Sequence, residues 1–518
     1  MEKKNGRVIF NEVEMITDLY GIVNVSKFPR TAVIPIARDK DTGYVNAGPY
    51  SGGVVSVDPY MLVFGAKSWD GKLLYEETDE FVIGLPSKDQ VQDMWVMALS
   101  VPHGISEIDV AGCTELPMGI DAPGVKEFPI NLKCKMRKLI KLGKAMRNIV
   151  VCEVIGISMS KELIDMGRAE AAHTVPIHEA VLFHPYTNTY TPGHLGKELR
   201  GVLREPQKHD FKPDENGKVY IDKSQFYQVP YNDIFVKAVV PQPNYGFITL
   251  NEDGSPHITA ITGGLLMHCP PAVHIPLKKD SVAYKNLKRH GYFTVAYPVR
   301  SIEKEFLALR KSDGTFKGSG FTPDYSGGSD VPGIKECPAN MECRVFVLED
   351  IPDSDYAVVI ADKIGVYADE KMQEFVKNRF MDYYPELIYT VYDYGMNEVF
   401  GIMNEFKPVL PHPSYGSRHN DAWATGPEQY QSGFFFWLMD LMMMGYLTEI
   451  EYGHIRKWTT FFRNQGRYSP EPLRTQMRER LTKVIRMMSH AHRDFDKWHE
   501  VHEYLNEIIQ KEPKPLYQ

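Results

Sequence analysis

The chain has 518 residues, of which 43% are hydrophobic and 24% are charged. This length and this balance are typical of a globular protein with about two to four domains. The formal net charge of -8 argues against a nucleic-acid-binding surface that depends on bulk positive charge, while it leaves open a local basic pocket for an anionic ligand.

Three features of the composition bear on location. Residues 1–20 mix charged with apolar side chains and lack the apolar core of a signal peptide. The longest apolar run, residues 434–447, contains Asp440 and is shorter than the roughly 20 residues that cross a bilayer. The six cysteines form no CxxC pair, so they predict reduced, packed thiols rather than a zinc site or a disulfide framework. We therefore expect a cytoplasmic protein that binds neither membrane nor nucleic acid.

Strand patterns dominate the first part of the chain. Short apolar or alternating runs bounded by Gly, Pro and Asp predict strands at residues 31–37, 60–65 and 81–85. Residues 161–172 have helical spacing, and the stretch that follows to residue 222, punctuated by Pro and Gly, is typical of a linker.

The strand patterns then return, at residues 245–250, 272–277 and 292–297. Gly43 and Gly254 each stand where a hairpin turn requires a positive φ. Towards the end of the chain helical spacing takes over, at residues 371–380, 427–447, 449–464 and 470–509.

A repeat explains why the strand patterns occur twice. Residues 125–134 (Val-Lys-Glu-Phe-Pro-Ile-Asn-Leu-Lys-Cys) recur as residues 334–343 (Ile-Lys-Glu-Cys-Pro-Ala-Asn-Met-Glu-Cys), with five identities in ten positions. The residues around this segment match at nearly the same offset, as Gly124 matches Gly333 and Gly43 matches Gly254. Collinear matches whose offset drifts by only a few residues indicate a duplicated domain.

The predicted domains follow from the repeat. Copy 1 spans residues 20–165 and copy 2 spans residues 233–374, with a linker of helix and loops at 166–232 and a helical region at 375–518. Short strands with turn signals at this spacing predict a small closed or partly open barrel in each copy. The predicted fold class is therefore a β-rich α+β protein.

Copy 1 carries three motifs in order: Asn-Ala-Gly-Pro-Tyr-Ser at residues 46–51, Val-Ser-Val-Asp-Pro at 55–59 and Asn-Leu-Lys-Cys at 131–134. With these motifs, nearly all of copy 1 resembles the flavin reductase-like family of FMN-binding split β-barrels, which includes flavoredoxin-type proteins. In copy 2, Lys-Lys-Asp-Ser at residues 278–281 and Asn286 resemble the family's Lys-Asp-Thr-x-x-Asn segment near the cofactor phosphate.

The two copies depart from the family pattern in complementary ways. Copy 2 lacks the Ala-Pro-x-Ser element, and copy 1 has Lys-Ser-Trp-Asp at residues 67–70 where the Lys-Asp-Thr element is expected. Since two barrels associate in the family with FMN near their interface, the resemblance implies an internal pseudo-dimer with one well-formed FMN site and one degenerate site. The implied cofactor-binding residues are Asn46, Ala47, Gly48, Pro49, Tyr50, Ser51, Lys67, Ser68, Thr259, Thr262, Lys278, Lys279, Asp280, Ser281 and Asn286.

The chemistry of these residue types agrees with FMN. Lys278, Lys279 and Ser281 supply the cations and hydrogen-bond donors that a phosphate dianion needs. Small residues such as Gly52 let backbone donors approach a flavin ring closely. The alternative interpretation is that the lysines form a solvated turn and the glycines only shape hairpins. Related split barrels also bind the deazaflavin F420 or haem, and the residues do not distinguish these cofactors from FMN.

A loop in the helical region supplies candidate catalytic residues. Residues 414–421 bring Tyr415, Arg418 and His419 close together. If this region covers the flavin, these side chains would bind an anionic or phenolic substrate, and His419 or Tyr415 would donate the proton that accompanies hydride transfer. The alternative is that Arg418 and Asp421 form an ion pair that only ties the loop down.

A group of histidines near the C-terminus has two possible interpretations, a metal site or a solvated helix. His492, Asp496 and His499 share one face of a helix at a spacing that metal ligands use. The same spacing is common on a charged, solvated helix, and we predict such a helix and no metal site.

Three functions stay open. The first is an FMN-dependent oxidoreductase that acts on a small organic substrate by hydride transfer at flavin N5, because the helical region exceeds what a single family member needs. The second is a flavin reductase that takes hydride from NAD(P)H and supplies reduced flavin to a partner enzyme. The third is a flavoredoxin-like electron-transfer protein with a redox partner such as ferredoxin. The sequence also leaves open whether the pseudo-dimer forms a homodimer.

Overall fold

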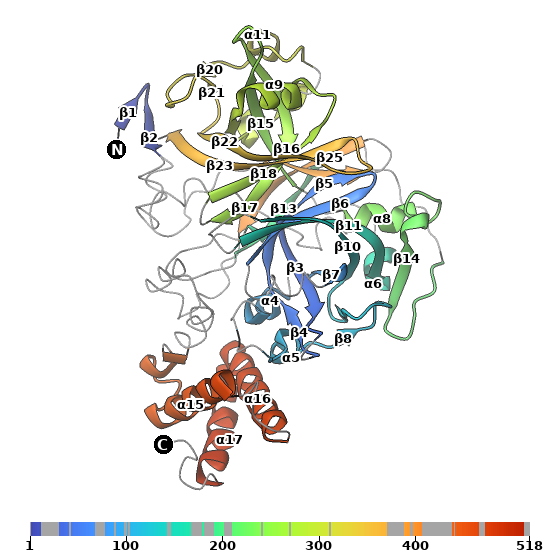
Figure 1. Cartoon of the computed structure of the whole chain (residues 1–518), viewed down its shortest axis with the longest axis vertical. Helices are drawn as coiled ribbons and strands as arrows, with labels where there is room; N and C mark the ends of the chain where they lie inside the picture. The colour runs from blue at the N-terminus through green and yellow to red at the C-terminus, as the bar shows by residue number, and fades with distance from the viewer. Residues whose placement is uncertain are drawn as a thin grey trace.

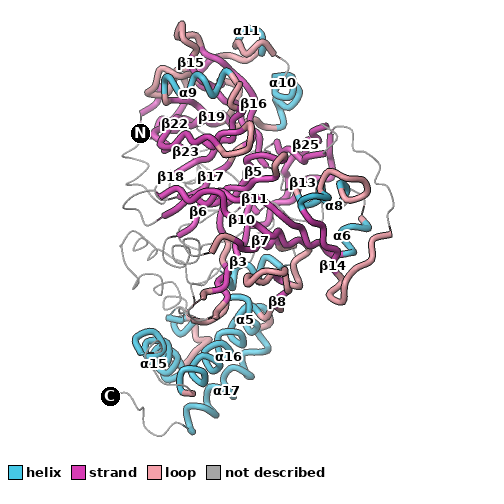
Figure 2. Tube along the Cα trace, turned by 45° about the vertical axis from the view of Figure 1, so that its right-hand side comes forward, coloured by secondary structure: helices cyan, strands magenta, loops and turns pink. Residues whose placement is uncertain are grey.

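The computed structural model of the chain describes residues 2–11, 31–40, 43–67, 78–87, 90–97, 101, 104–141, 147–166, 179–180, 191–200, 210–239, 242–268, 271–309, 312–369, 388–393, 397–406, 438–439, 441–465 and 472–511. Three parts follow one another along the long axis of the molecule (Figure 1): copy 2 at the top, copy 1 below it and a group of C-terminal helices at the bottom. Figure 2 shows that strands fill the first two parts.

Copy 1 forms a closed barrel of antiparallel strands. Its strands are β3 Thr31–Arg38, β4 Val45–Ala47, β5 Tyr50–Val57, β6 Tyr60–Lys67, β7 Glu80–Leu85, β10 Ile130–Lys141 and β11 Arg147–Ser160. Around the barrel they pair in the order β7, β3, β5, β6, β11, β10, and β10 pairs back with β7. The short strand β4 pairs with β3 just before β5 begins.

Copy 2 repeats this arrangement. Its strands are β15 Gln242–Leu250, β16 Pro256–Thr262, β17 Gly264–His268, β18 Pro271–Lys278, β19 Tyr292–Ala296, β22 Ala339–Asp350 and β23 Tyr356–Asp369. Each corresponds in sequence order to a strand of copy 1, with β16 in the place of β4 and β17 in the place of β5. The pairing runs from β17 through β18, β23, β22, β19 and β15 to β16, and Gly263 joins β16 to β17.

The two copies share even their irregularities, which confirms the duplication. The β10–β11 ladder shifts register between Lys133 and Cys134, and the β22–β23 ladder shifts between Glu342 and Cys343, at the same offset of 209 as the sequence repeat. A second shift follows three residues later in each ladder. All six strands that the sequence predicts are confirmed. Gly43 and Gly254 have φ of 72° and 79°, as the turn prediction requires.

The two barrels pack against each other through apolar side chains that point away from the barrel interiors. Val151 of copy 1 and its repeat equivalent Ile360 of copy 2 belong to one buried cluster, together with Val55, Met61, Val63, Ile140, Ile149, Ile351 and Val358. At the rim of this cluster Lys138 and Glu349 form an ion pair between the copies. Because equivalent residues face each other, the tandem barrels form the pseudo-dimer that the sequence predicts.

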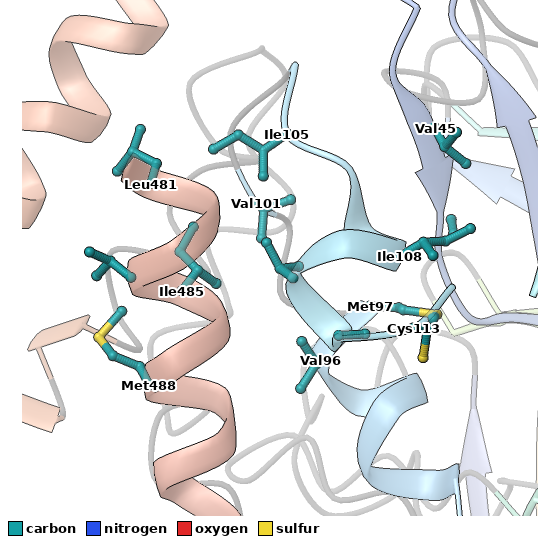
Figure 3. Packing of buried hydrophobic residues seen from close by; sticks show 14 of the residues in the cluster. Val45, Val96, Met97, Val101, Ile105, Ile108, Cys113, Leu481, Ile485 and Met488 are labelled. Carbon is teal, nitrogen blue, oxygen red and sulfur yellow. The ribbon is translucent and has the colours of Figure 1, made fainter. Parts of the chain in front are cut away.

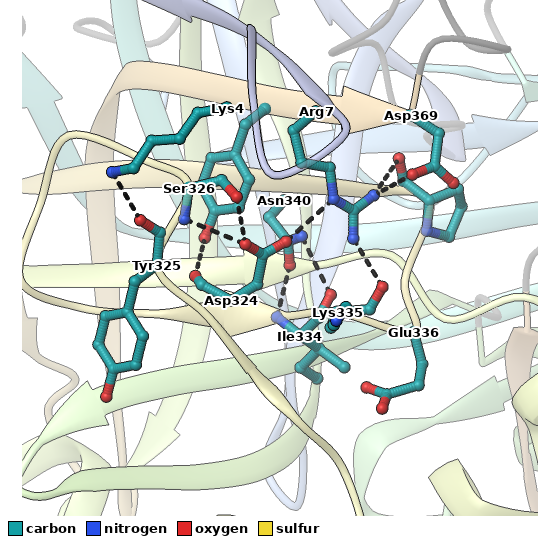
Figure 4. Close-up of polar contacts among 12 residues, drawn as sticks. Lys4, Arg7, Asp324, Tyr325, Ser326, Ile334, Lys335, Glu336, Asn340 and Asp369 are labelled. Carbon is teal, nitrogen blue, oxygen red and sulfur yellow. Dashed lines mark hydrogen bonds and ion pairs between the residues drawn. The ribbon is translucent and has the colours of Figure 1, made fainter.

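Each barrel is extended by a strand from outside the repeat. Strand β14, Lys218–Asp222, pairs with the end of β11 in copy 1. The N-terminal hairpin of β1 Glu2–Lys4 and β2 Arg7–Asn11 pairs with the end of β23 in copy 2. Figure 4 shows the guanidinium of Arg7 between Asp324 and Asp369, where its ion-pair distances are 2.9 Å and 2.5 Å.

The C-terminal helices dock onto copy 1. They are α15 Glu449–Gln465, α16 Leu473–Arg493 and α17 Trp498–Lys511, and they share one core with α4 Val91–Met97 and α5 Glu107–Ala111 of copy 1. Figure 3 shows Leu481, Ile485 and Met488 of α16, which belong to the same buried cluster as Val101 and Ile105 of copy 1. The spacing of these α16 residues places them on one helical face, which is the face that is buried.

Some elements differ from the sequence prediction. Residues 375–518 were predicted as a helical region, yet strands β24 Ile388–Asp393 and β25 Asn397–Phe406 lie within it and extend the sheet of copy 2. Strands β13 Thr191–Arg200 and β14 lie in the predicted linker. The predicted helix at 161–172 is described only as α6 Lys161–Asp165 and the residue after it. These short segments form strands because they pair with strands that are distant in the chain. The local spacing of apolar residues does not reveal such pairing.

Two further predictions concern thiols and membranes. Cys113, Cys134, Cys152, Cys337 and Cys343 are buried free thiols, as predicted, and burial raises the pKa of Cys134, Cys337 and Cys343. Among the helices of the described residues, none is long and apolar enough to cross a bilayer.

Candidate functional site

The motif at residues 46–51 lies at the edge where β4 ends and β5 begins. Ala47 pairs with Ile36 of β3, and β5 starts at Tyr50. The carboxylate of Glu107 lies beside this edge: the Ala47 N–H donates to it at 3.2 Å, and the Asn46 side-chain amide lies 3.5 Å from it. Glu107 is only 7% exposed, so this segment is held by a buried carboxyl side chain.

Tyr50 and Gly48 shape the surface next to that edge. The half-buried ring of Tyr50 lies tilted against Phe64, with ring centroids 6.2 Å apart. A Cβ at Gly48 would lie 3.5 Å from the Tyr50 ring, an ordinary contact distance, whereas a Cβ at Gly52 would lie 2.7 Å from a Val33 methyl. Gly52 is therefore required by strand packing within the barrel, and Gly48 is the glycine with room beside it.

Helix α5 is short, and both of its ends are capped. The Ser106 hydroxyl accepts a hydrogen bond from the Asp109 N–H at 3.3 Å, and Gly112 closes the helix in the left-handed conformation with φ of 74°. These caps fix the first turn of the helix, which carries Glu107. The location of Glu107 beside Ala47 thus follows from a local sequence signal.

The C-terminal helices hold α5 and the start of β4 from the other side. The Arg486 Nε donates to the Asp109 carbonyl at 2.7 Å, and the Arg478 guanidinium lies 4.3 Å from the ring centroid of Tyr44. A Cβ at Gly112 would lie 2.7 Å from His490 Nε2, so α16 and α5 are in close contact. Burial raises the pKa of Asp109 on this helix, and the nearby Arg486 guanidinium opposes that rise.

The interface between the barrels brings the two halves of the family pattern onto neighbouring strands. Strand β5, which begins within the motif of copy 1, packs against β17 and β18 of copy 2. Strand β18 ends at Lys278, where the second half of the pattern begins. Figures 1 and 2 both show β5 beside β17 and β18.

Several residues of the copy 2 motif have structural partners. The Lys279 ammonium donates to the carbonyls of Ile351 and Ser354 at 3.1 Å and 2.6 Å, so it ties down the loop between β22 and β23. Lys278 is exposed, and its ammonium lies 6.0 Å from the ring centroid of Tyr356. Asp280 is exposed on the turn that follows.

Ser281 and Asn286 position the helix after this turn, α9 Val282–His290. The Ser281 hydroxyl accepts from the Tyr284 N–H at 3.2 Å and caps the helix. The buried Asn286 amide donates to Thr249 at 3.0 Å and to Asn251 at 3.1 Å. These bonds anchor α9 to β15 and to the turn that follows it, and a role of Asn286 near a cofactor phosphate stays a prediction.

The remaining predicted residues are distributed as follows. Thr259 and Thr262 are half-exposed on β16, Pro49 precedes β5, and Ser51 and Lys67 lie within β5 and β6. Ser68 and the predicted catalytic residues Tyr415, Arg418 and His419 lie outside the described residues. In the helical region, His499 Nδ1 contacts the Asp496 carbonyl and His502 Nδ1 lies 2.7 Å from Glu451. Within the described residues, no group of three His, Cys, Asp or Glu side chains is placed to hold a metal.

Glu107 is not among the site residues that the sequence predicts. It lies 60 residues beyond Ala47 in the chain and outside every motif. The signal that would have drawn attention to it is the Ser-Glu-x-x-x-x-Gly pattern of residues 106–112, which is typical of a short capped helix.

A comparison with protein families decides the classification. The model of the flavin reductase like domain matches twice, at residues 25–172 and 239–390, and together these matches cover more than half of the chain. The chain belongs to the flavin reductase-like family. Membership supports a flavin cofactor and flavin-related redox activity, and the double match agrees with the two barrels of the fold.

Curated relatives of this flavin reductase-like chain match part of it. An uncharacterized protein of Aquifex aeolicus is 26% identical over 157 residues, which are 28% of this chain and 78% of the relative. An uncharacterized protein of Methanothermobacter thermautotrophicus is 28% identical over 123 residues, which are 22% of this chain and 58% of the relative.

Several solved structures are also similar to part of the chain. The 2-nitrobenzoate 2-nitroreductase of Pseudomonas fluorescens is 25% identical, with 29% of this chain and 74% of that one covered and a TM-score of 0.26. Component B of the Bacillus cereus nitrilotriacetate monooxygenase is 25% identical, with 28% of this chain and 78% of that one covered and a TM-score of 0.27. Flavoredoxin of Desulfovibrio vulgaris is 19% identical, with 33% of this chain and 87% of that one covered and a TM-score of 0.25. Because these TM-scores are low, the family assignment rests on the two family matches.

Proposed function

We propose that this protein is an FMN-dependent oxidoreductase that acts on a small organic substrate. The observation that supports the proposal is the packing of β5 of copy 1 against β17 and β18 of copy 2, because β5 begins within the motif of copy 1 and β18 ends where the Lys-Lys-Asp-Ser segment of copy 2 begins. Bound flavin supplies hydride transfer at its N5 position, and the protein supplies the binding, the orientation and the electrostatics.

The charges on the two sides of the interface favour one orientation of the cofactor. The buried carboxylate of Glu107 lies at the copy 1 motif and repels a phosphate group. Lys278 and the N-terminus of α9 lie at the copy 2 motif and attract one. We therefore assign the ring to the side of residues 46–51 and the phosphate to the side of Lys278.

The residues at the copy 1 motif fit a flavin ring. The half-buried ring of Tyr50 offers an apolar surface. The backbone at Gly48 has space where a side chain would otherwise stand, so a flat ring can approach the main chain there.

The C-terminal helices lie beside the copy 1 site, and within the described residues they pack on copy 1 alone. They contact α5 and Tyr44, which flank the motif. We propose that this region forms part of the substrate pocket, and that Tyr415, Arg418 and His419 bind substrate and supply a proton.

A second function is favoured by the family itself, whose description is that of flavin reductases. In this alternative NAD(P)H reduces the flavin, and the reduced flavin leaves for a partner enzyme. The two functions differ in whether the flavin stays bound during turnover.

An anaerobic experiment separates them. The flavin-loaded protein is reduced with NADH, NADPH or dithionite, and the band at about 450 nm is followed while organic acceptors or free FMN are added. The oxidoreductase proposal predicts that an organic acceptor restores the band while the flavin stays with the protein on a desalting column. Reoxidation only by free FMN, with loss of flavin on the column, would support the alternative.

A further inference from the structure

The Glu107 carboxylate does in copy 1 what a backbone carbonyl does in copy 2. In the repeat, Ala47 corresponds to Ile258, and Ser106, which caps α5, corresponds to Thr315, which caps the short helix that follows it. The Ala47 N–H donates to the Glu107 carboxylate at 3.2 Å, whereas the Ile258 N–H donates to the Gly314 carbonyl at 2.9 Å. A backbone carbonyl is thus a sufficient acceptor for this N–H in the fold, and copy 1 has an acidic side chain in its place.

Thr315 has the same task as Ser106, and the apolar Phe316 follows it where Glu107 follows Ser106. The Thr315 hydroxyl accepts from the Gly318 N–H at 2.9 Å and caps α11 Phe316–Ser319. The charge of Glu107 is thus a property of copy 1 alone, and copy 1 is the copy that keeps the Gly-Pro-Tyr-Ser element at residues 48–51.

We infer that Glu107 is a positioning residue for the flavin ring, and this inference rests on the proposed function. Its carboxylate holds the backbone of Ala47 and approaches the Asn46 amide, so it fixes the edge that presents the motif. A bond to a charged, buried acceptor is stronger than one to a neutral acceptor. The same charge lowers the electron affinity of a flavin bound at this edge, because reduction adds negative charge to the ring.

The C-terminal helices help to fix the position of α5, and therefore of the Glu107 carboxylate. Arg486 of α16 donates to the Asp109 carbonyl one half-turn after Glu107, and both caps of α5 are in place. Glu107 therefore links the docked helical region to the flavin motif through α5.

Two variants test this role. Glu107→Gln keeps the size and one acceptor oxygen, so the barrel folds, but it removes the charge. Asp109→Asn removes the same charge from an exposed position of the same helix and leaves the Arg486 bond, which is made by the backbone. The measurements are the FMN dissociation constant by fluorescence quenching, the midpoint potential of the FMN-saturated protein and the melting temperature.

The inference predicts that Glu107→Gln weakens FMN binding about ten-fold, the size expected when a charge-assisted hydrogen bond becomes a neutral one, and raises the midpoint potential. Asp109→Asn leaves both values close to wild type. A merely structural Glu107 would lower the melting temperature without moving the potential of the saturated protein, and that result would overturn the inference. If the wild-type protein binds no FMN, the proposed function fails and the inference fails with it; if wild type binds FMN and Glu107→Gln matches it in affinity and potential, only the inference fails.

Discussion

Arg7 and Lys218 occupy equivalent positions in the two barrels although neither belongs to the repeat. Arg7 pairs in register with Asp369 of β23, and Lys218 pairs with Ser160, the repeat equivalent of Asp369. Both cations are buried and reach back to the turn before the long hairpin: Arg7 Nη1 donates to the Pro338 carbonyl at 3.2 Å, and Lys218 Nζ donates to the Phe128 carbonyl at 2.6 Å. Two unrelated segments thus extend the two barrels and bind the equivalent turn with a buried cation.

Lys218 makes the stability of copy 1 depend on pH. Burial lowers the pKa of Lys218 from 10.5 to about 8. Between these values the unfolded chain binds the proton and the folded chain does not, so the free energy of unfolding rises as pH increases from about 8 to 10.5. In Lys218→Arg, which stays charged throughout, this rise is lost. Denaturant unfolding of the wild-type and Lys218→Arg proteins at several pH values measures this rise in the free energy of unfolding. The same pH dependence in both proteins would show that Lys218 is not its cause.

Arg7 anchors the N-terminal hairpin. Arg7→Met leaves the buried Asp324 without its ion-pair partner, so we expect a loss of about 3–5 kcal/mol in the unfolding free energy of the part that contains copy 2. Lys4→Met removes a cation from the same hairpin at an exposed bond to the Tyr325 carbonyl, and we expect less than about 0.5 kcal/mol. Equal losses in the two variants, measured by denaturant unfolding, would show that the buried ion pair is not the cause.

Much of this fold can be predicted from the sequence, but contacts between distant segments cannot. The repeat, the barrel strands and the turn at Gly43 were predictable because they rest on local patterns and on a second copy of the same pattern. The pairing of Arg7 with Asp369 was not, because it joins residues 362 apart in the chain. Strand β14 has only five residues and follows a stretch rich in Pro, Gly and charged residues, so its local pattern was too short to stand out from the predicted linker.

The same contrast applies to the site. The motif at residues 46–51 and the turn at Lys278 were found through family resemblance, whereas Glu107 required the packing of α5 against β4. Lys279 and Asn286 look like phosphate ligands in the sequence, and only the structure shows their bonds to loop carbonyls and to Thr249.

Gly112 tests the docking of α16 on α5. Gly112→Ala meets two obstacles: a φ of +74° and the His490 ring at 2.7 Å. Gly119→Ala meets only the first, since Gly119 has φ of +69° and open space around it. We expect about 1 kcal/mol of destabilisation for Gly119→Ala and clearly more for Gly112→Ala, with thermal unfolding as the measurement. Equal shifts in melting temperature would mean that His490 of α16 does not pack closely against Gly112 at the end of α5.

Ile360 tests the interface between the barrels. It is 1% exposed, so Ile360→Asp places a carboxylate in the apolar cluster and should cost several kcal/mol. Phe346→Asp makes a similar change at a side chain that is 53% exposed and should have little effect. A flavin site shared by both copies also predicts that Ile360→Asp weakens FMN binding before global unfolding occurs. Unchanged stability and FMN affinity in Ile360→Asp would exclude this interface in solution.

The most direct test of the central claim is the amount of flavin that the purified wild-type chain holds. The protein is saturated with FMN and desalted, its absorption is recorded near about 375 and 450 nm, and the flavin released on denaturation is quantified per chain. A single composite site, formed by the motif of copy 1 and the turn of copy 2, predicts one FMN per chain. Two FMN per chain would contradict the single site, and no bound flavin at all would contradict the flavoenzyme.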